Sequence, residues 1–267
     1  MSKEQKPELS IILPSIRPQM LEKVYDSICD STKSNFELVI VSPYLLPSYF
    51  ETKRNVKYVR DFGSPVRAHN IALLLCEGKY LTWIADDAIM LPGSIDEHLE
   101  MLKEMGPDIR NVIVSKYKEG QQGSTDREKV HPDDYFQIRT GPAASPYFPP
   151  NWWLFNVAFM HTELAEALGG WDCSYEATWP AHTDMAIRAQ AIGANVKMSG
   201  LVRDVADHMP DTQGDHAPIH FAQGDHDLPL MNMRYNRPDW HQNVQMQINV
   251  MCWKQSPTVW KRRFGDE

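Results

Sequence analysis

The sequence predicts an α/β protein whose core is an open, largely parallel sheet flanked by helices. Short apolar runs alternate with amphipathic segments through the first hundred residues, and such alternation is typical of parallel sheets. Capping residues and glycines stand at the ends of several amphipathic segments. The chain has 267 residues, of which 42% are hydrophobic, so it can bury a sizeable core.

Strands are predicted where apolar and β-branched residues form short bounded runs. These runs are residues 9–14, 36–42, 56–60, 79–85, 195–198 and 201–207. Residues 156–170 are predicted to form a strand and then a helix, which Gly169 and Gly170 terminate.

Helices are predicted where apolar residues recur three and four positions apart. They cover residues 17–30, 64–78, 94–106 and 182–193. Ser64 is a candidate N-cap with Pro65 in the first turn, and Ser94 and Thr183 are candidate caps of the last two helices.

The remaining segments are less regular. Residues 121–151 are rich in glycine, proline and charge, which indicates a long loop, and the chain is loop-like from His208 to about Pro238. Residues 239–254 are amphipathic and are expected to form a C-terminal helix. The tetrapeptide QGDH occurs at 213–216 and again at 223–226. It indicates either a metal or anion site or a chance repeat in a polar loop.

Composition excludes several classes of protein. The formal net charge of −8 disfavours a protein that coats nucleic acid. No apolar run approaches the roughly 18 residues that a membrane-spanning helix requires, and the polar N-terminus lacks the apolar centre of a secretory signal. The four cysteines lie far apart, with no Cys-x-x-Cys pair, as in reduced intracellular proteins. We therefore expect a soluble, cytoplasmic protein.

Two adjacent carboxylates, Asp86 and Asp87, follow directly on the apolar run that ends at Ala85. In parallel sheets ligands bind beyond the carboxyl ends of the strands, so these side chains are expected to face a crevice. Paired carboxylates can hold a divalent cation, which can neutralise a diphosphate. They can equally form a turn or a helix cap after the strand.

Four stretches in order resemble the glycosyltransferases of family 2, which have the GT-A fold. They are "LSIILPSIRP", "FGSPVRAHNIALLLCEGKYLTWIADDA", "NVAFMHTELAEALGGWD" and "HTDMAIRAQAIGANV". The resemblance covers about residues 8–210. It implies a domain over 1–210, with a nucleotide-sugar half at about 1–115 and an acceptor half at about 116–210. Residues 211–267 then form a C-terminal loop and helix packed on the same domain.

The resemblance implies that the protein moves a hexosyl or pentosyl group from a nucleotide-diphospho-sugar to an acceptor hydroxyl. The residues that would line the nucleotide-sugar are Pro14, Ser15, Arg17, Arg67, Asn70 and Asp86. Asp87 takes the position of the metal ligand, and His208 could complete the metal site. Mixed oxygen and imidazole ligation would favour Mn²⁺ somewhat over Mg²⁺.

The acceptor side would include Gly170, Trp171, Asp172 and Trp179. Trp171 or Trp179 is expected to line the acceptor cleft, and Trp152 or Trp153 to pack inside.

The sequence departs from the family pattern at three points. Ala85 replaces the first carboxylate of the Asp-x-Asp motif, and the second strand ends in "VSPYLLP" instead of an Asp-rich turn. His182 occupies the position of the catalytic base. We expect either His182 or Asp184 to be the base of an inverting displacement. Asp184 could instead form an ion pair with Arg188, one helical turn away.

Two other functions fit less of the sequence. One is a glycan- or nucleotide-binding protein that keeps the fold without turnover, which Ala85 and His182 favour. The other is a sugar nucleotidyltransferase, which usually carries a glycine-rich loop where this chain reads "PSIRPQ". The acceptor is left open among a glycan, a small metabolite, a protein and a modified nucleic-acid base.

Overall fold

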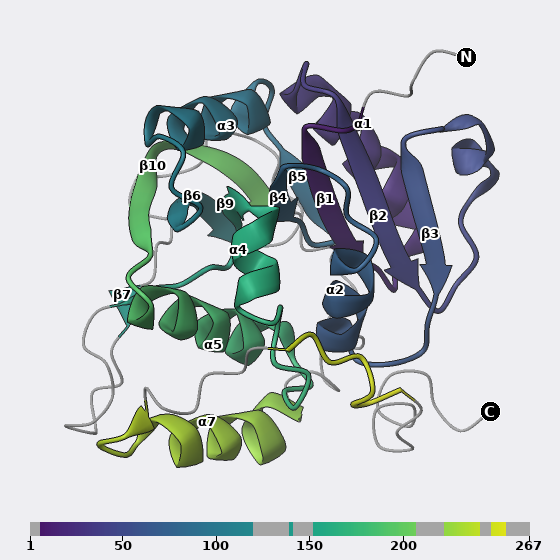
Figure 1. Cartoon of the computed structure of the whole chain (residues 1–267). Coiled ribbons are helices and arrows are strands. Elements are labelled where there is room, and N and C mark those ends of the chain that lie inside the picture. The colour runs from purple at the N-terminus through teal and green to yellow at the C-terminus, as the bar shows by residue number, and fades with distance from the viewer. Residues whose placement is uncertain (1–5, 120–138, 141–151, 207–221, 241–246, 255–267) are drawn as a thin grey trace.

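The computed structural model describes residues 6–119, 139–140, 152–206, 222–240 and 247–254 (Figure 1). An eight-stranded sheet forms the centre of the molecule. Its strands are β1 Leu9–Pro14, β2 Phe36–Ser42, β3 Val56–Arg60, β4 Tyr80–Trp83, β5 Ala88–Met90, β6 Asn111–Glu119, β9 Ala158–His161 and β10 Asn195–Ala206. The short strands β7 Arg139–Thr140 and β8 Trp152–Trp153 pair separately.

The sheet is mostly parallel, which confirms the predicted fold class. Its strand order is β3-β2-β1-β4-β9-β6-β10-β5. The pairs β3·β2, β2·β1, β1·β4 and β6·β10 are parallel, whereas β9 and β5 run antiparallel to their neighbours. The carboxyl ends of β1 to β4 therefore lie along one edge of the sheet, where a ligand crevice is expected.

Helices cover both faces of the sheet (Figure 1). Their bounds are α1 Leu21–Ser31, α2 Pro65–Leu73, α3 Ser94–Glu104, α4 Thr162–Ala167, α5 Thr178–Ala191 and α7 Leu228–Tyr235. Short 3-10 turns lie at η1 Pro18–Met20 and η2 Ser48–Thr52, and a π-helical turn, η5 Gln223–Asp227, leads into α7.

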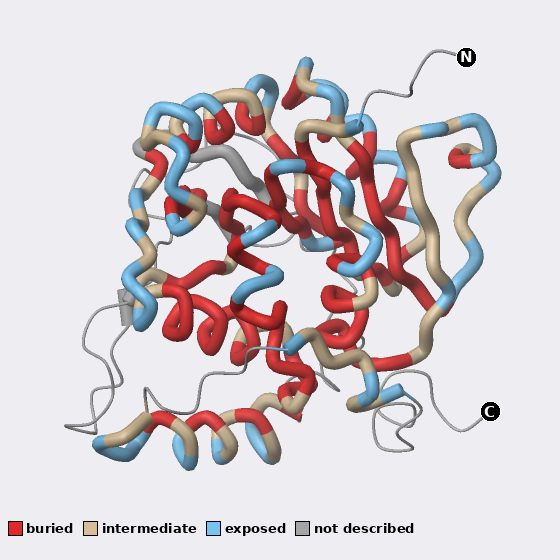
Figure 2. Tube along the Cα trace, viewed as in Figure 1, coloured by how far each residue is buried: buried red, intermediate tan, exposed pale blue. Residues whose placement is uncertain are grey.

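Each face of the sheet has its own apolar core, because alternate strand residues point to opposite faces. Ile11 and Leu13 pack with α1 and α3, whereas Ile12 packs with α2, α4, α5 and α7. Figure 2 shows the central strands buried along most of their length. Burial on both faces explains why these strands are continuous apolar runs.

The predicted element starts are correct at α2 and wrong at α5. The Ser64 hydroxyl accepts from Arg67 N at 3.1 Å, as expected of the N-cap. Helix α5 begins at Thr178 instead of His182, so Thr183 lies inside it and its hydroxyl donates to Trp179 O. Ser94 is the first helical residue of α3 rather than its cap. Residues 195–206 form one long strand, β10, instead of two.

The expected C-terminal helix is absent from the described part of residues 239–254. Residues 247–254 run as an irregular segment, in which Trp253 has a φ of 57°. This segment is held by side chains of the domain, including Asn70, whose Nδ2 donates to Asn249 O. The helix lies earlier, at α7, in a region expected to be a loop. A proline at the second position of α7 suits a helix start.

Within the described residues, no helix combines the length and the apolar character needed to cross a membrane. All four cysteines are free thiols.

Candidate active site

The carboxylate of Asp86 joins the turn after β1 to the end of β4. Its Oδ2 accepts from Ser15 Oγ at 2.9 Å, from Ile16 N at 2.8 Å and from Arg17 N at 2.9 Å. Its Oδ1 accepts from Arg17 Nη1 at 2.5 Å. The family resemblance implied that Ser15, Arg17 and Asp86 line the nucleotide-sugar. The structure brings these three residues together, and their contact with a nucleotide-sugar stays a prediction. Pro14 is the last residue of β1, directly before this turn.

Arg17 also faces the second carboxylate. Its Nη1 lies 3.4 Å from Asp87 Oδ2. All three residues are buried, at 8% exposed for Arg17, 5% for Asp86 and 4% for Asp87. A guanidinium therefore occupies the position between the two carboxylates.

Asp86 is held by other groups of the protein, so a divalent metal at this edge of the sheet would depend on Asp87. The contacts of Asp86 are made to the turn and to Arg17, and Ala85 supplies no carboxylate. No group of three or more His, Cys, Asp or Glu residues suited to a metal ion occurs in the described part of the chain. His208, the other predicted ligand, lies outside the described residues. The predicted metal roles of Asp87 and His208 stay predictions.

Arg67 lies in the first turn of α2, at the same edge of the sheet as Arg17. Its Nε and Nη2 donate to the carboxylate of Asp61 over 2.9–3.1 Å. Its Nη1 is buried without a hydrogen-bond partner among the described residues. An unpaired buried donor costs free energy, so a ligand acceptor that reached this nitrogen would remove that cost. Sequence reasoning missed Asp61, although a carboxylate just after the end of β3 could have indicated it.

Asn70 connects α2 to the turn after α4 and to the segment at residues 247–254. Its Nδ2 donates to Trp171 O at 2.7 Å and to Asn249 O at 2.9 Å, and its Oδ1 accepts from Trp171 N at 2.9 Å. Gly170 permits this contact, because a Cβ there would lie 2.4 Å from Asn70 Oδ1. In the structure the amide of Asn70 holds the backbone at Trp171 and Asn249, and the predicted contact with a nucleotide stays a prediction.

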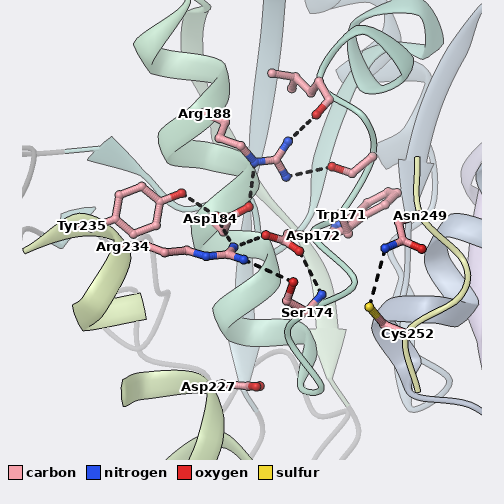
Figure 3. Close-up of polar contacts among 12 residues, drawn as sticks. Trp171, Asp172, Ser174, Asp184, Arg188, Asp227, Arg234, Tyr235, Asn249 and Cys252 are labelled. Carbon is pink, nitrogen blue, oxygen red and sulfur yellow. Dashed lines mark hydrogen bonds and ion pairs between the residues drawn. The ribbon is translucent and has the colours of Figure 1, made fainter. Parts of the chain in front are cut away.

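Asp184 is the centre of a buried polar network (Figure 3). Its Oδ2 accepts from Arg188 Nε at 2.7 Å, and its Oδ1 accepts from the Tyr235 hydroxyl. Arg188 also donates to Leu168 O at 2.5 Å and to Gly170 O at 2.8 Å. The predicted ion pair between Asp184 and Arg188 is confirmed. Both carboxylate oxygens are occupied, which leaves Asp184 poorly placed to accept a proton.

His182 has very different surroundings from Asp184, because the two residues lie on different sides of α5. Its ring packs against His69, Trp83 and Trp171, with centroid separations of 5.2, 5.4 and 6.2 Å. Both ring nitrogens are buried without a hydrogen-bond partner among the described residues. Burial, and secondarily the nearby His69, hold the pKa of His182 well below 6.5, so its ring is neutral at pH 7.

The predicted acceptor-side residues differ in exposure. Trp171 is fully buried in the core against Trp83 and His69, so its ring presents no open surface. Asp172 accepts from Ser174 N at 2.9 Å and forms an ion pair with Arg234. Trp179 is half-buried in the first turn of α5. Trp153 is partly buried against the core, and the side chain of Trp152 lies outside the described residues.

Sequence reasoning missed the contribution of α7 to this side of the domain. Arg234 and Tyr235 bind the carboxylates of Asp172 and Asp184 (Figure 3). The region was expected to be a loop, so no spacing argument pointed to them. The amphipathic pattern that was noticed lies a few residues further along the chain.

Asp227, which directly follows the second QGDH copy, has a structural role. Asp227 is fully buried and accepts from Glu176 N at 3.0 Å and Ala177 N at 2.7 Å, just before α5. His226 Nδ1 lies 2.7 Å from the same carboxylate. The first copy, with His216, and also His220 and His241 lie outside the described residues. The expectation of a metal or anion site at these histidines stays untested.

Comparisons with known proteins identify the family. Residues 10–162 match the model of glycosyl transferase family 2. Residues 1–349 of TarS from S. aureus superpose with a TM-score of 0.55 at 17% identity, over 74% of this chain and 60% of that one. The same TarS fragment in complex with UDP gives a TM-score of 0.53 at 16% identity, with the same coverage of both chains. This chain thus spans less than two thirds of those structures. No curated protein matches it. The family model covers more than half of the chain, and the protein therefore belongs to glycosyl transferase family 2.

Proposed function

We propose that this glycosyltransferase moves a sugar from a nucleotide-diphospho-sugar to an acceptor hydroxyl. The observation that carries the proposal is the pair of buried arginines, Arg17 and Arg67, at the carboxyl edge of the parallel strands. Buried guanidinium groups suit phosphate oxygens and base carbonyls. The structure of TarS in complex with UDP supports a nucleotide-bound donor for the same fold.

The transfer step follows from the chemistry of this donor class. The acceptor oxygen forms a bond to the anomeric carbon, while the bond from that carbon to the diphosphate oxygen breaks. The electron pair leaves with the diphosphate, and the proton of the acceptor hydroxyl passes to a base. Attack from the face opposite the leaving group inverts the anomeric configuration.

We propose His182 as that base in preference to Asp184. The ring nitrogens of His182 have no partner among the described residues, whereas both oxygens of Asp184 are occupied. A neutral imidazole can accept a proton at pH 7. Burial lowers the pKa of His182, so its ring is a weaker base than that of an exposed histidine.

A donor panel tests the function. Thermal shift with UDP-, GDP- and dTDP-sugars should reveal one base that stabilises the fold, by about 2.7 kcal/mol at a hundredfold excess over Kd. Donor hydrolysis or transfer, followed by product release, then shows turnover. A donor that stabilises the fold without turnover would instead support a binding protein that has lost its activity.

A pair of variants tests the base. His182→Gln should lower kcat by about 10²- to 10⁴-fold, with donor binding retained in the thermal shift. His69→Gln changes a second buried histidine of the same cluster, whose Nδ1 is bonded to Pro65 O, and should leave kcat within about tenfold. Equal effects of the two substitutions on kcat would remove the base assignment.

A further inference from the structure

We propose that Cys173 and Cys252 form a reversible disulfide bond when the folded protein meets a small-molecule disulfide such as oxidised glutathione. Cys173 follows the glycine turn after α4, and Cys252 belongs to the irregular segment at residues 247–254, called the strap below. Both are free thiols in the structure. The bond would fix the strap to the domain. This inference goes beyond the proposed function and does not depend on it.

The two cysteines are neighbours in space, although 79 positions separate them in the chain. The thiol of Cys173 donates to the main-chain oxygen of Cys252 at 3.5 Å. One residue further along each stretch, Trp253 Nε1 donates to Ser174 O at 3.3 Å. The strap and the turn after α4 therefore run side by side at the position of the thiols.

Asn70 and Asn249 hold the two stretches together. Asn70 Nδ2 donates to Trp171 O at 2.7 Å and to Asn249 O at 2.9 Å. The side-chain amide of Asn249 donates in turn to Cys252 Sγ at 3.6 Å (Figure 3). Two cysteines can be bridged without movement of the main chain only where their backbones are already close. These contacts keep the backbones close, so the bond requires mainly rotation of the two side chains.

The two thiols differ in exposure, and this difference sets the order of the reaction. Cys173 is fully buried, whereas Cys252 is partly exposed. Burial, and secondarily the neighbouring Cys252, raises the pKa of Cys173 to about 12. A buried thiol of high pKa reacts poorly with an oxidant in solution. Cys252 is therefore the thiol that meets the oxidant, and Cys173 is the one that closes the bond.

The reaction is a two-step thiol–disulfide exchange. The Cys252 thiolate attacks one sulfur of oxidised glutathione, which forms a mixed disulfide and releases one glutathione thiolate. The Cys173 thiolate then attacks Cys252 Sγ and releases the second glutathione. The two protein thiols lose two electrons and two protons. Both pass to the glutathione disulfide, which becomes two molecules of reduced glutathione.

A metal ion accounts less well for this pair of thiols. Across the described ranges, no group of three or more His, Cys, Asp or Glu residues is suited to hold one. The other two cysteines have separate surroundings, since Cys76 Sγ donates to Ala72 O and Cys29 is exposed on α1. They serve as controls within the same chain.

The bond would restrain a segment that packs beside the candidate active site. A Cβ on Gly63 would lie 2.4 Å from Arg67 Cδ and 2.8 Å from Trp253 O. The strap therefore passes next to the start of α2. Transient disulfides of this kind are the form in which disulfides usually occur in reducing compartments, where they sense the redox state.

Peptide mapping of the wild-type chain tests the proposal directly. The reduced, folded protein is incubated with oxidised glutathione, digested with trypsin without a reductant and analysed by mass spectrometry. The peptides that contain Cys173 and Cys252 should be joined. Thermal shift should show a Tm about 5–15 °C higher in the oxidised chain, because the bond closes a long loop, and dithiothreitol should reverse the change.

Three variants assign the roles of the thiols. Cys173→Ser should accumulate glutathione on Cys252, because the thiol that closes the bond is missing. Cys252→Ser should leave Cys173 as a free thiol. Cys76→Ser is the matched control and should still form the bridge. The mapping of the wild-type chain holds even if a variant fails to fold.

Three results would overturn the proposal. The first is a wild-type chain that carries glutathione on Cys252 without a bridge to Cys173. The second is a bridge that involves Cys29 or Cys76 in place of this pair. The third is an oxidised chain whose Tm equals that of the reduced chain, since the strap would then not be fixed by the bond.

Discussion

Arg188 donates from Nε to Asp184 Oδ2 over 2.7 Å, one turn away on α5, and both side chains are only 2% exposed. The same guanidinium donates to the carbonyls of Leu168 and Gly170. This buried pair therefore fastens α5 to the glycine turn that follows α4. The pair therefore has a structural role, and its loss should lower the free energy of unfolding.

Asp184→Asn should lower the free energy of unfolding by about 3–5 kcal/mol, because an amide N–H₂ would face Arg188 and leave a buried charge unpaired. Urea denaturation at pH 7 measures this. Asp108→Asn, which changes an exposed ion pair with Arg110, should cause a much smaller loss. A fully stable Asp184→Asn protein whose turnover falls by 10²-fold or more would show that Asp184 is the base instead.

Gly170→Ala should destabilise the protein more than an equivalent change at Gly106. Both glycines have positive φ, 67° and 92°, so alanine is strained at either position. Only at Gly170 would the Cβ meet a neighbour, Asn70 Oδ1 at 2.4 Å, since nothing lies within 4 Å at Gly106. We expect a loss of about 1–2 kcal/mol at Gly106 and at least about 3 kcal/mol at Gly170. Similar urea midpoints for the two variants would contradict this reading of the turn.

Asp227→Ala should cost about 2–4 kcal/mol of stability, because it leaves the N–H groups of Glu176 and Ala177 buried without an acceptor. Asp227→Asn keeps one carbonyl oxygen and should cost less. Asp225→Ala is the control, since Asp225 is exposed in the same π-helical turn. Thermal unfolding of the three variants gives the comparison, and equal Tm values for Asp225→Ala and Asp227→Ala would refute the anchoring role.

The stability of the protein should fall between pH 6.5 and pH 4. Burial lowers the pKa of His69 to about 4 and holds that of His182 well below 6.5. The unfolded chain therefore binds protons at these rings before the folded chain does, so acid favours unfolding. For His69 the loss approaches about 3 kcal/mol by pH 4.

Urea midpoints at pH 7, 6, 5 and 4.5 measure this dependence. His69→Gln should flatten the curve over that range, because the titrating ring is gone. An unaltered pH dependence in His69→Gln would mean that other groups, and not this histidine, cause the acid sensitivity.

Much of the fold could be predicted because local patterns encode it. Runs such as Leu9–Pro14 and Phe36–Ser42 are apolar on both faces, and the structure buries both faces. Ser64 and Pro65 mark the start of α2 correctly, since capping depends on residues close in sequence. The start of α5 was misplaced because Thr178 has no capping side chain before it. Helix α7 was missed because its short amphipathic face is stabilised by packing rather than by local signals.

The candidate site was predictable only in part. The strand pattern placed Asp86 at the carboxyl edge of the sheet. The family resemblance assigned Ser15 and Arg17 to the same ligand site, and the structure brings the three residues into contact. Sequence spacing could not show that the turn after β1 binds the carboxylate of Asp86. The donors are the backbone N–H groups of Ile16 and Arg17, which lie 70 and 69 positions away in the chain. Residues 182 and 184 were equivalent candidates in sequence, and only their packing separates them.

The α/β class, the order of the main elements and the resemblance to family 2 could be read from the sequence alone, because they depend on periodicity and local motifs. The tertiary structure alone decided what each polar side chain does. It placed a guanidinium between Asp86 and Asp87, filled both oxygens of Asp184, and left the nitrogens of His182 without a partner among the described residues. The reason is physical: the role of a buried charge depends on which partners lie within a few ångströms of it, and those partners come from distant parts of the chain.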